Sequence, residues 1–340
     1  MNVIETQQLA KVFSGGVRAV DQIDFDVKEG EIFGFLGPNG AGKTTTIKIL
    51  NTLLLPTSGS AIVTGLDVVK NPAEVRKNVG YVAQDVGVDE HATGRENLGL
   101  YGRFYRLDGR TIKQRIRELF ELVDLTGYED KMVSTYSGGM RKRLDIAMGL
   151  IHSPQLIFLD EPTVGLDPQT RTHIWDYVRN LAKAMGVTIF LTTHYMEEAD
   201  HLADRIAIID LGKIIAMGTP DELKKSISGD VVTLSCRSSV AEECAQFMER
   251  AQAALEGKSF VLGMQQTDSD LAVYVDSGES AAPAIMRLLS GKEIEVNTLS
   301  VSRPTLDDVF LKYTGHTIRA QEGQATTFTL MRRQRDRSKR

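Results

Sequence analysis

The sequence predicts an α/β domain with a mixed sheet core, an antiparallel β-subdomain and a helical subdomain, followed by a small α+β domain of ferredoxin-like order. Three observations lead to this fold class. A glycine-rich loop at 37–45 lies between an apolar run and a helical pattern, a second apolar run at 156–159 ends in two carboxylates, and strand and helix patterns follow the order βαββαβ after residue 226. A length of 340 residues agrees with about two domains.

Composition and charge exclude several classes of protein. A net charge of -5 and a pI near 5.8 give no sign of a nucleic-acid partner. The N-terminus lacks the pattern of a signal peptide, and no uninterrupted apolar run reaches the roughly 18 residues that a membrane span needs. Two cysteines, Cys236 and Cys244, are too few for a disulfide scaffold and are expected to be reduced. We therefore expect a soluble cytoplasmic protein whose role at a membrane depends on a partner chain.

The loop at 37–45 fits the phosphate-loop pattern of a glycine, four residues and then Gly-Lys-Thr. The apolar run at 32–36 predicts a buried strand before it, and apolar residues at helical spacing over 47–54 predict a helix after it. The glycines let backbone N–H groups point at phosphate oxygens, Lys43 can reach the β- and γ-phosphates, and Thr44 can place its hydroxyl on Mg²⁺. The residues expected to bind phosphate are Gly37, Pro38, Asn39, Gly40, Ala41, Gly42, Lys43, Thr44 and Thr45.

Residues 2–33 alternate apolar and polar positions in short stretches, which predicts antiparallel strands joined by glycine turns. Phe13 falls where one of these strands ends in such a turn. Its ring either belongs to the core or offers its face to a nucleotide base. The spacing alone favours the core.

Apolar stretches at 61–64 and 79–83 predict two further strands, and Gln84 ends the second one. A glutamine there is usually a polar strand terminus. Its amide could contact Mg²⁺ or a water that attacks phosphate if this strand lies beside the phosphate loop. From about 93 to 126 the apolar residues recur at helical spacing, which predicts an inserted helical lobe.

A second glycine pair follows this lobe. Ser137 is a good N-cap for a helix that runs to about residue 151, and Gly138 and Gly139 leave the amide end of that helix uncovered. This is either an ordinary capped helix start or a second phosphate site made from a helix N-terminus. The basic residues 141–143 are expected on a solvated face.

The apolar run at 156–159 predicts a strand buried on both faces, as in a parallel sheet, and it ends in Asp160 and Glu161. In α/β sheets ligands bind at the carboxyl ends of strands. Asp160 would hold Mg²⁺, directly or through its water shell, because a hard cation prefers oxygen ligands. Glu161 would orient or deprotonate the water that attacks the γ-phosphate.

The next apolar run, at 187–193, predicts another buried strand, and it ends in His194; a turn at 165–168 that contains Asp167 precedes it. A lone histidine is more often structural than functional. His194 differs because it ends a buried strand, as Glu161 does, and its imidazole could therefore lie near the γ-phosphate.

Together and in this order, these motifs resemble the nucleotide-binding subunit of an ABC transporter over about residues 1–225. The resemblance matches six motifs of that family, which are the Walker A loop at 37–45, the Q-loop at Gln84, the signature at Ser137, Gly138 and Gly139, the Walker B strand ending in Asp160 and Glu161, the D-loop at Asp167 and the H-loop at His194. Two details depart from the family pattern. Tyr136 and Met140 stand where the signature usually has leucine and glutamine, and Phe13 replaces a tyrosine that stacks on adenine. Because the ring face is kept, the resemblance favours the stacking role for Phe13.

The resemblance implies an ABC-type ATPase of the P-loop NTPase class that hydrolyses ATP to ADP and phosphate. Lys43, Glu161 and His194 would be catalytic. The Mg²⁺ ligands would be Thr44, Gln84 and Asp160. The ATP-binding residues would be the loop 37–45 together with Phe13, Gln84, Ser137, Gly138, Gly139 and Asp167.

In the family, the serine and glycines of the signature face the γ-phosphate of a second subunit. Two ATP molecules are therefore expected between two head-to-tail ATP-binding subunits, the second most simply another copy of this chain. The helical subdomain, about 85–150, and the segment after Gln84 would transmit the motion to a separate transmembrane permease. That partner would hold the chain at the cytoplasmic face of the cell membrane.

The remaining sequence predicts a C-terminal α+β accessory domain at 226–316 and a polar, basic tail at 317–340 that is expected to be disordered. Residues 304–311 resemble the C-terminal motif of the drug- and lipid-exporter branch typified by daunorubicin-resistance ATPases. Export of a drug, lipid or other hydrophobic compound is therefore expected. The alternatives are the ATPase subunit of an importer and a non-transport ATPase of the same family.

Overall fold

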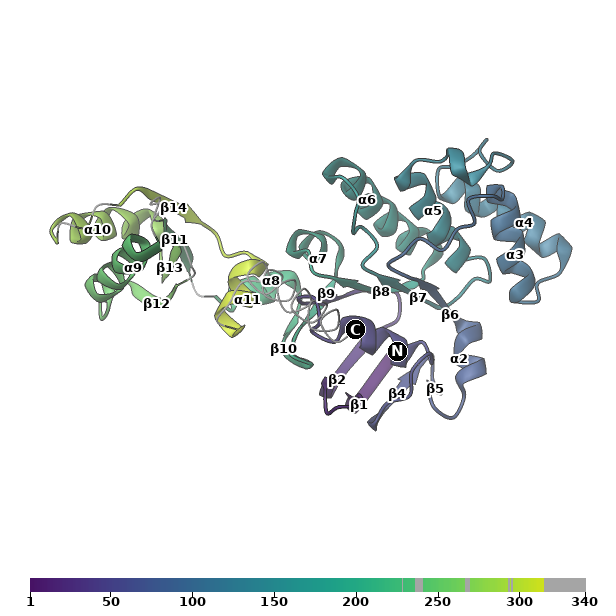
Figure 1. The fold of residues 1–340 in the computed structure, drawn as a ribbon, viewed down its shortest axis with the longest axis horizontal. Coiled ribbons are helices and arrows are strands. Elements are labelled where there is room, and N and C mark those ends of the chain that lie inside the picture. The colour runs from purple at the N-terminus through teal and green to yellow at the C-terminus, as the bar shows by residue number, and fades with distance from the viewer. Residues whose placement is uncertain (228, 236–240, 267–269, 293, 295, 315–340) are drawn as a thin grey trace, which may run out of the picture. The chain divides into compact units, whose positions relative to one another are not determined.

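The computed structural model describes the chain except for residues 228, 236–240, 267–269, 293, 295 and 315–340. It divides into two compact units, Met1–Met217 and Gly218–Arg340 (Figure 1). The predicted tail at 317–340 lies outside the described residues.

A six-stranded sheet forms the centre of the first unit. Its strand order is β10-β9-β3-β8-β7-β6, and the four neighbouring pairs from β9 to β6 are parallel. The strands are β3 (Ile32–Leu36), β6 (Val79–Val82), β7 (Leu156–Asp160), β8 (Thr188–Thr193), β9 (Arg205–Asp210) and β10 (Lys213–Gly218). Every residue of β3, β7 and β8 is buried, as expected for parallel strands that are covered on both faces. The prediction of buried strands before the phosphate loop and before the two carboxylates is confirmed.

A four-stranded antiparallel sheet lies on one face of the parallel sheet (Figure 1). Its order is β2-β1-β4-β5, with strands β1 (Asn2–Val12), β2 (Arg18–Lys28), β4 (Ser58–Val63) and β5 (Leu66–Asp67). Within the predicted region 2–33, the apolar stretches at 3–4 and 9–13 lie on one continuous strand, β1, up to Val12. Its register shifts near Gln8, whose φ of 47° marks a local irregularity, and this bend explains why the alternation reads as interrupted.

Phenylalanines fill the space between the two sheets. The ring of Phe190 on β8 lies 5.7 Å from Phe33, 5.5 Å from Phe35, 5.6 Å from Phe158 and 6.0 Å from Phe25. Ring pairs at such spacing stabilise a core beyond the area that they bury. One aromatic cluster therefore fixes β3, which leads into the loop at 37–42, and β7, which leads to residues 160–161.

Helices cover the opposite face of the parallel sheet, where α5, α6 and α7 lie in Figure 1. The helices of this unit are α1 (Lys43–Leu50), α2 (Pro72–Asn78), α3 (Gly94–Phe104), α4 (Gly109–Leu122), a 3₁₀ turn η1 (Val133–Thr135), α5 (Gly138–Gly149), α6 (Pro168–Met185) and α7 (Met196–Leu202). Helices α3 and α4 confirm the predicted helical lobe. Thr93 and Glu96 form a capping box at the start of α3, and Asp108 caps α4.

The second unit contains α8 (Pro220–Lys225), α11 (Leu306–Thr314) and an α+β sandwich. The sandwich runs β11 (Asp230–Ser235), α9 (Ala241–Leu255), β12 (Val261–Gln266), β13 (Asp270–Val275), α10 (Gly278–Ser290) and β14 (Thr298–Ser302). Its sheet order is β12-β13-β11-β14, with antiparallel pairs throughout. The predicted βαββαβ order is confirmed, and the strand order is that of a ferredoxin-like fold.

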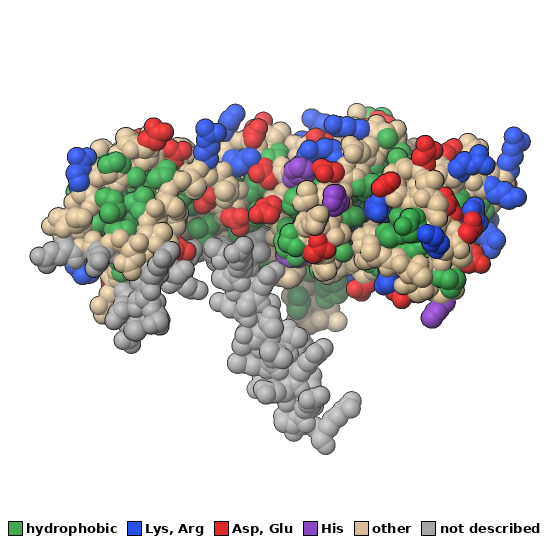
Figure 2. Space-filling model, turned by 90° about the horizontal axis from the view of Figure 1, so that it is seen from above, with side chains coloured by type: hydrophobic (Ala, Val, Ile, Leu, Met, Phe, Trp, Pro, Cys, Tyr) green, Lys and Arg blue, Asp and Glu red, His purple; other side chains and the backbone are tan. Residues whose placement is uncertain are grey.

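The cysteines and the possibility of a membrane span were also considered in the sequence. Cys244 is disulfide-bonded, so the prediction that both cysteines are reduced is wrong; Cys236, the other cysteine, lies outside the described residues. Among the helices that the structure describes, none has the length and apolar character to cross a membrane. Acidic and basic side chains are interspersed on the face drawn in Figure 2.

Candidate functional site

Two glycines of the phosphate loop lie where no side chain fits. A Cβ at Gly37 would come within 2.2 Å of the Ile209 carbonyl oxygen on β9, and one at Gly42 within 2.3 Å of the Ala19 carbonyl oxygen on β2. Gly42 also has a φ of 110°, which favours glycine. The loop is thus enclosed between the ends of two other strands. Helix α1 begins within the loop at Lys43 and has no side-chain cap, so its first N–H groups are available to an anion.

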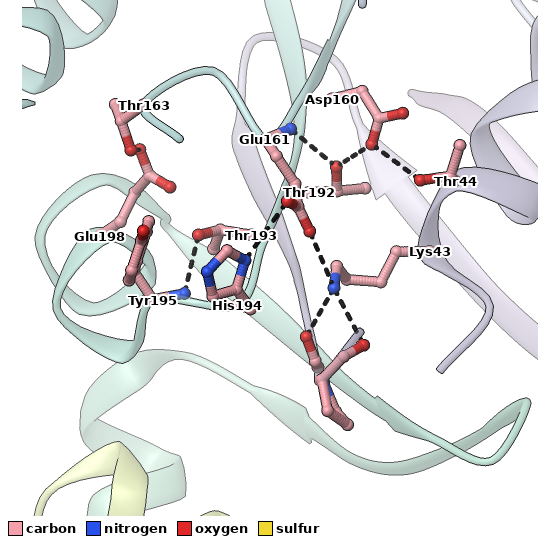
Figure 3. A network of polar contacts seen from close by, with 12 residues as sticks. Lys43, Thr44, Asp160, Glu161, Thr163, Thr192, Thr193, His194, Tyr195 and Glu198 are labelled. Carbon is pink, nitrogen blue, oxygen red and sulfur yellow. Dashed lines mark hydrogen bonds and ion pairs between the residues drawn. The ribbon is translucent and has the colours of Figure 1, made fainter. Parts of the chain in front are cut away.

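Lys43 is buried and points along the inside of this loop (Figure 3). Its Nζ donates hydrogen bonds to the carbonyl oxygens of Gly37 at 2.6 Å and Pro38 at 3.0 Å. The same nitrogen lies 3.1 Å from Oε1 of Glu161, and the two side chains are 4% and 6% exposed. Residues that lie 118 positions apart (161 − 43) therefore share one buried ion pair.

Asp160 at the end of β7 binds two threonine hydroxyls (Figure 3). Thr192 on β8 donates to Asp160 Oδ1 at 2.6 Å, and Thr44 on α1 donates to the same oxygen at 3.3 Å. Burial raises the pKa of Asp160, the charge of Glu161 raises it further, and the two hydroxyls oppose the change. A carboxylate and a hydroxyl thus meet beside the first turn of α1, which is a donor set that suits a hard cation.

Glu161 follows β7 in a strained conformation, with a φ of 48°. Its backbone N–H donates to Thr192, to the carbonyl oxygen and to Oγ1, each at 3.1 Å, and these bonds hold it there. Burial alone would raise the pKa of the carboxyl group. Contacts with His194 and Lys43 outweigh that effect, so the pKa of Glu161 lies below its ordinary value. Glu161 is therefore ionised at neutral pH.

His194 follows β8 and faces Glu161 from the side opposite Lys43 (Figure 3). Its Nδ1 lies 3.3 Å from Glu161 Oε2, and its ring lies 4.1 Å from the ring of Tyr195. Tyr195 is in turn fixed by a hydrogen bond from its backbone N–H to Thr193 Oγ1 at 2.9 Å. The structure thus brings together residues from three separate points of the sequence, which are Lys43 and Thr44, Asp160 and Glu161, and His194.

Phe13 and Gln84 lie on exposed segments. Phe13 follows β1 in the turn that leads to β2, its side chain is 40% exposed, and Lys11 Nζ lies 5.4 Å from its ring centre. It is therefore not the core residue that spacing alone favoured. Gln84 is exposed two residues after the end of β6, which pairs in parallel with β7. The strand that leads to Gln84 thus neighbours the strand that carries Asp160.

The signature residues and Asp167 lie at the N-termini of two helices. Ser137 caps α5, where its Oγ accepts from the Met140 N–H at 3.3 Å, and Asp167 caps α6, where it accepts from the Thr170 N–H at 2.9 Å. Ser137, Gly138 and Asp167 are exposed, and a Cβ at Gly139 would meet Thr170 Cγ2 at 2.8 Å. No described contact joins these residues to the phosphate loop of their own chain. The exposed signature is open to another molecule.

Sequence reasoning missed several residues that support the site. Thr192 donates to the Asp160 carboxylate and accepts from the Glu161 backbone N–H. The only signal for it in the sequence was a pair of threonines at a strand end. Glu198 on α7 is fully buried and accepts hydrogen bonds from Thr163 Oγ1 at 2.8 Å and Trp175 Nε1 at 2.9 Å. Burial raises its pKa. The expectation that 141–143 form a solvated face is wrong for Lys142, which is buried.

Comparisons with known proteins agree with this geometry. The family model for ABC transporters matches residues 20–164, and the model for the C-terminal domain of DrrA1-3-like ATP-binding proteins matches residues 218–314. The chain is 44% identical over 302 residues to the daunorubicin resistance ATP-binding protein DrrA2 of Streptomyces coeruleorubidus, which covers 89% of this chain and 92% of the relative. It belongs to the ATP-binding proteins of ABC transporters.

Other members of this ABC family agree. The doxorubicin resistance ATP-binding protein DrrA of Mycobacterium tuberculosis is 43% identical over 88% of this chain and 89% of its own length. The linearmycin resistance ATP-binding protein LnrL of Bacillus subtilis is 35% identical over 93% and 100%.

Solved structures of ABC cassettes share the fold. The cbiO1 protein of Clostridium perfringens has a TM-score of 0.62 and 25% identity, over 75% of this chain and 99% of its own. A dimeric ATP-binding cassette in a post-hydrolysis state with ADP and Pi has a TM-score of 0.57 and 25% identity, over 64% and 98%. The chain is therefore an ABC-type ATPase.

Proposed function

We propose that this chain is the ATPase subunit of a drug exporter, acting with a separate transmembrane permease at the cytoplasmic face of the membrane. Its relatives over most of the chain are named for resistance to daunorubicin, doxorubicin and linearmycin. The match to the DrrA-type C-terminal domain at 218–314 supports the same branch. The observation that carries the catalytic part of the proposal is the buried contact of Glu161 with Lys43 on one side and His194 on the other.

Glu161 acts as the base for the attacking water in this proposal. Its pKa lies below its ordinary value, so the carboxylate is ready to accept a proton at neutral pH. The Nδ1 of His194 lies 3.3 Å from Glu161 Oε2, and through this contact the imidazole orients the carboxylate. Lys43 and the N–H groups of the loop stabilise the charge of the phosphates.

Mg²⁺ is the metal that suits this site. The Thr44 hydroxyl already donates to Asp160 Oδ1 at 3.3 Å beside α1, and Gln84 lies two residues after β6, the strand that neighbours β7. Proteins bind Mg²⁺ through one or two carboxylates together with substrate phosphates, which this donor set matches. The ion would neutralise charge on the β- and γ-phosphates.

A second ATP-binding subunit completes the site. Ser137 and Gly138 are exposed at the amide end of α5, and among the described residues no contact joins them to the phosphate loop of their own chain. In a head-to-tail pair with a second copy of this chain, each signature would face the nucleotide of the other. We assign to the closed pair the role of transmitting ATP-driven motion to the permease.

Drug accumulation in cells tests this proposal. Cells that express the chain with its permease should accumulate less daunorubicin than cells with the permease and the Glu161→Gln chain, measured by drug fluorescence at equal expression. Glu197→Gln is the matched control, because Glu197 is an exposed carboxylate on α7. Equal accumulation of daunorubicin with the active chain and the Glu161→Gln chain would contradict export of this drug by the complex.

A further inference from the structure

Helix α5 carries two buried charges that lie outside the catalytic cluster. Lys142 and Asp145 are three residues apart, and therefore on one face of the helix, and their side chains are 3% and 8% exposed. Lys142 Nζ lies 3.5 Å from Asp145 Oδ2. Burial lowers the pKa of Lys142 and raises that of Asp145, and the attraction between the two opposes both changes. Burying two charges is unfavourable unless they have partners, so their contacts are informative.

Those contacts lie on the two sides of Gln84. Lys142 Nζ donates to the carbonyl oxygen of Ala83 at 2.9 Å, directly before Gln84. Asp145 Oδ1 accepts from the backbone N–H of Gly87 at 3.3 Å, three residues after it. Within the described part of the chain, the main chain of residues 84–86 itself makes no hydrogen bond. The ion pair on α5 therefore holds both ends of a short exposed loop that contains Gln84.

Helix α5 is also fixed at its far end. A Cβ at Gly80 on β6 would come within 2.3 Å of the Gly149 carbonyl oxygen, so the backbones of β6 and the end of α5 are in direct contact. The N-terminus of the same helix is capped by Ser137. A single rigid helix thus connects the exposed signature, the loop around Gln84 and the sheet edge beside β7.

We propose that Lys142 and Asp145 are positioning residues, a clamp that sets the place of Gln84 and links the signature end of α5 to the ATP site of its own chain. This inference rests on the proposed function, because it takes Gln84 to act at the Mg²⁺–ATP site and Ser137 at the site of a second subunit. Contact between Ser137 and the nucleotide of the second subunit then changes the position of Gln84, because α5 connects the two. The clamp makes each site respond to occupancy of the other.

Single-turnover ATP hydrolysis by the full chain tests the clamp. The variant K142M/D145N removes both charges together, so neither is left buried alone. We expect its rate to fall about tenfold, as misplacement of a positioning contact does, while the dissociation constant for ATP stays within about twofold because the phosphate loop is untouched. In a Gln84→Ala background the same pair of substitutions should change the rate by less than about twofold.

Two further variants keep the test specific. K142R retains a donor for Ala83 and a charge for Asp145, and it should keep at least about half of the wild-type rate. K77M/E74Q removes an ion pair whose side chains are 67% and 55% exposed, and it should leave the rate unchanged. A wild-type rate for K142M/D145N, or an equal fall with and without Gln84, would overturn the clamp. If the wild-type chain itself hydrolysed no ATP, the proposed function would fail first.

Discussion

At the scale of single residues, Glu161 is the centre of the proposed reaction site. Its backbone is strained, with a φ of 48°, and two bonds to Thr192 hold that conformation. Its carboxylate lies between Lys43 and His194, at 3.1 and 3.3 Å. Strained residues persist where the surrounding structure fixes them, and such positions are common at active sites. Several contacts thus fix the position of this one carboxylate.

Replacing that carboxylate by an amide removes the base and keeps the shape. Glu161→Gln should hydrolyse ATP about 10²–10⁴-fold more slowly, the range typical for loss of a general base, while it still binds ATP through the phosphate loop. Phosphate release and equilibrium binding of ATP measure the two quantities separately. Glu197→Gln, on the exposed side of α7, should turn over normally. Unchanged turnover in Glu161→Gln would remove Glu161 from the role of base.

Glu198 gives a prediction about pH. It is fully buried, and burial raises its pKa above the ordinary value. An acid with a raised pKa binds protons more tightly in the folded state, so its ionisation lowers stability as pH rises through the folded pKa. Glu198→Gln keeps an acceptor for Thr163 and Trp175 but carries no charge. The melting temperature of the variant relative to wild type should therefore rise as pH increases above about 4.3, the ordinary pKa of a glutamate.

That comparison has a clear control. Glu198→Ala removes the acceptor and should destabilise the protein at every pH, by roughly 2–4 kcal/mol, because two buried donors lose their partner. A difference between Glu198→Gln and wild type that is constant across the pH range would show that Glu198 stays in one protonation state.

At the scale of elements, the phosphate loop is placed by strands rather than by its own contacts alone. The carbonyl oxygens of Ala19 on β2 and Ile209 on β9 approach Gly42 and Gly37 so closely that any side chain would displace one of them. The Gly212 N–H also donates to the Ala41 carbonyl oxygen at 3.0 Å. The antiparallel sheet and the parallel sheet thus meet at the loop.

Gly37→Ala tests this placement. Its Cβ would lie 2.2 Å from the Ile209 carbonyl oxygen, so β3 and β9 must separate. The variant should lose about 1–3 kcal/mol of unfolding free energy, as overpacked positions do, and its affinity for ATP should fall. Gly109→Ala is the control, because a Cβ at Gly109 has nothing within 4 Å and its φ is not positive. Equal stability of the two variants by chemical denaturation would contradict the close approach.

Elements also show what could be predicted from the sequence. The phosphate loop, the buried strands and the βαββαβ unit follow from spacing and periodicity, because those patterns are local. The burial of Lys142 could not be predicted, since its neighbours in the sequence are charged and its acceptor, the Ala83 carbonyl oxygen, comes from another segment. The same holds for Glu198, whose partners lie on α6 and in the loop before it. Side-chain contacts between distant segments carry no periodic signal.

At the scale of the whole molecule, the proposed reaction centre is divided between two chains. One chain supplies Lys43, Asp160, Glu161 and His194, and its own signature is exposed at the start of α5. The proposal therefore couples ATP binding to association. Within each chain, the clamp of Lys142 and Asp145 would connect the ATP site with the signature at the start of α5.

The most direct measurement is the mass of the Glu161→Gln chain in solution with Mg²⁺ and ATP. We expect a dimer that holds two ATP molecules, and a monomer when ATP is replaced by ADP. Adding Ser137→Arg, at an exposed N-cap whose loss costs only about 1 kcal/mol, should leave ATP bound but abolish the dimer. A Glu161→Gln chain that stays monomeric when saturated with ATP, or a dimer that forms equally well with Ser137→Arg, would contradict the shared site.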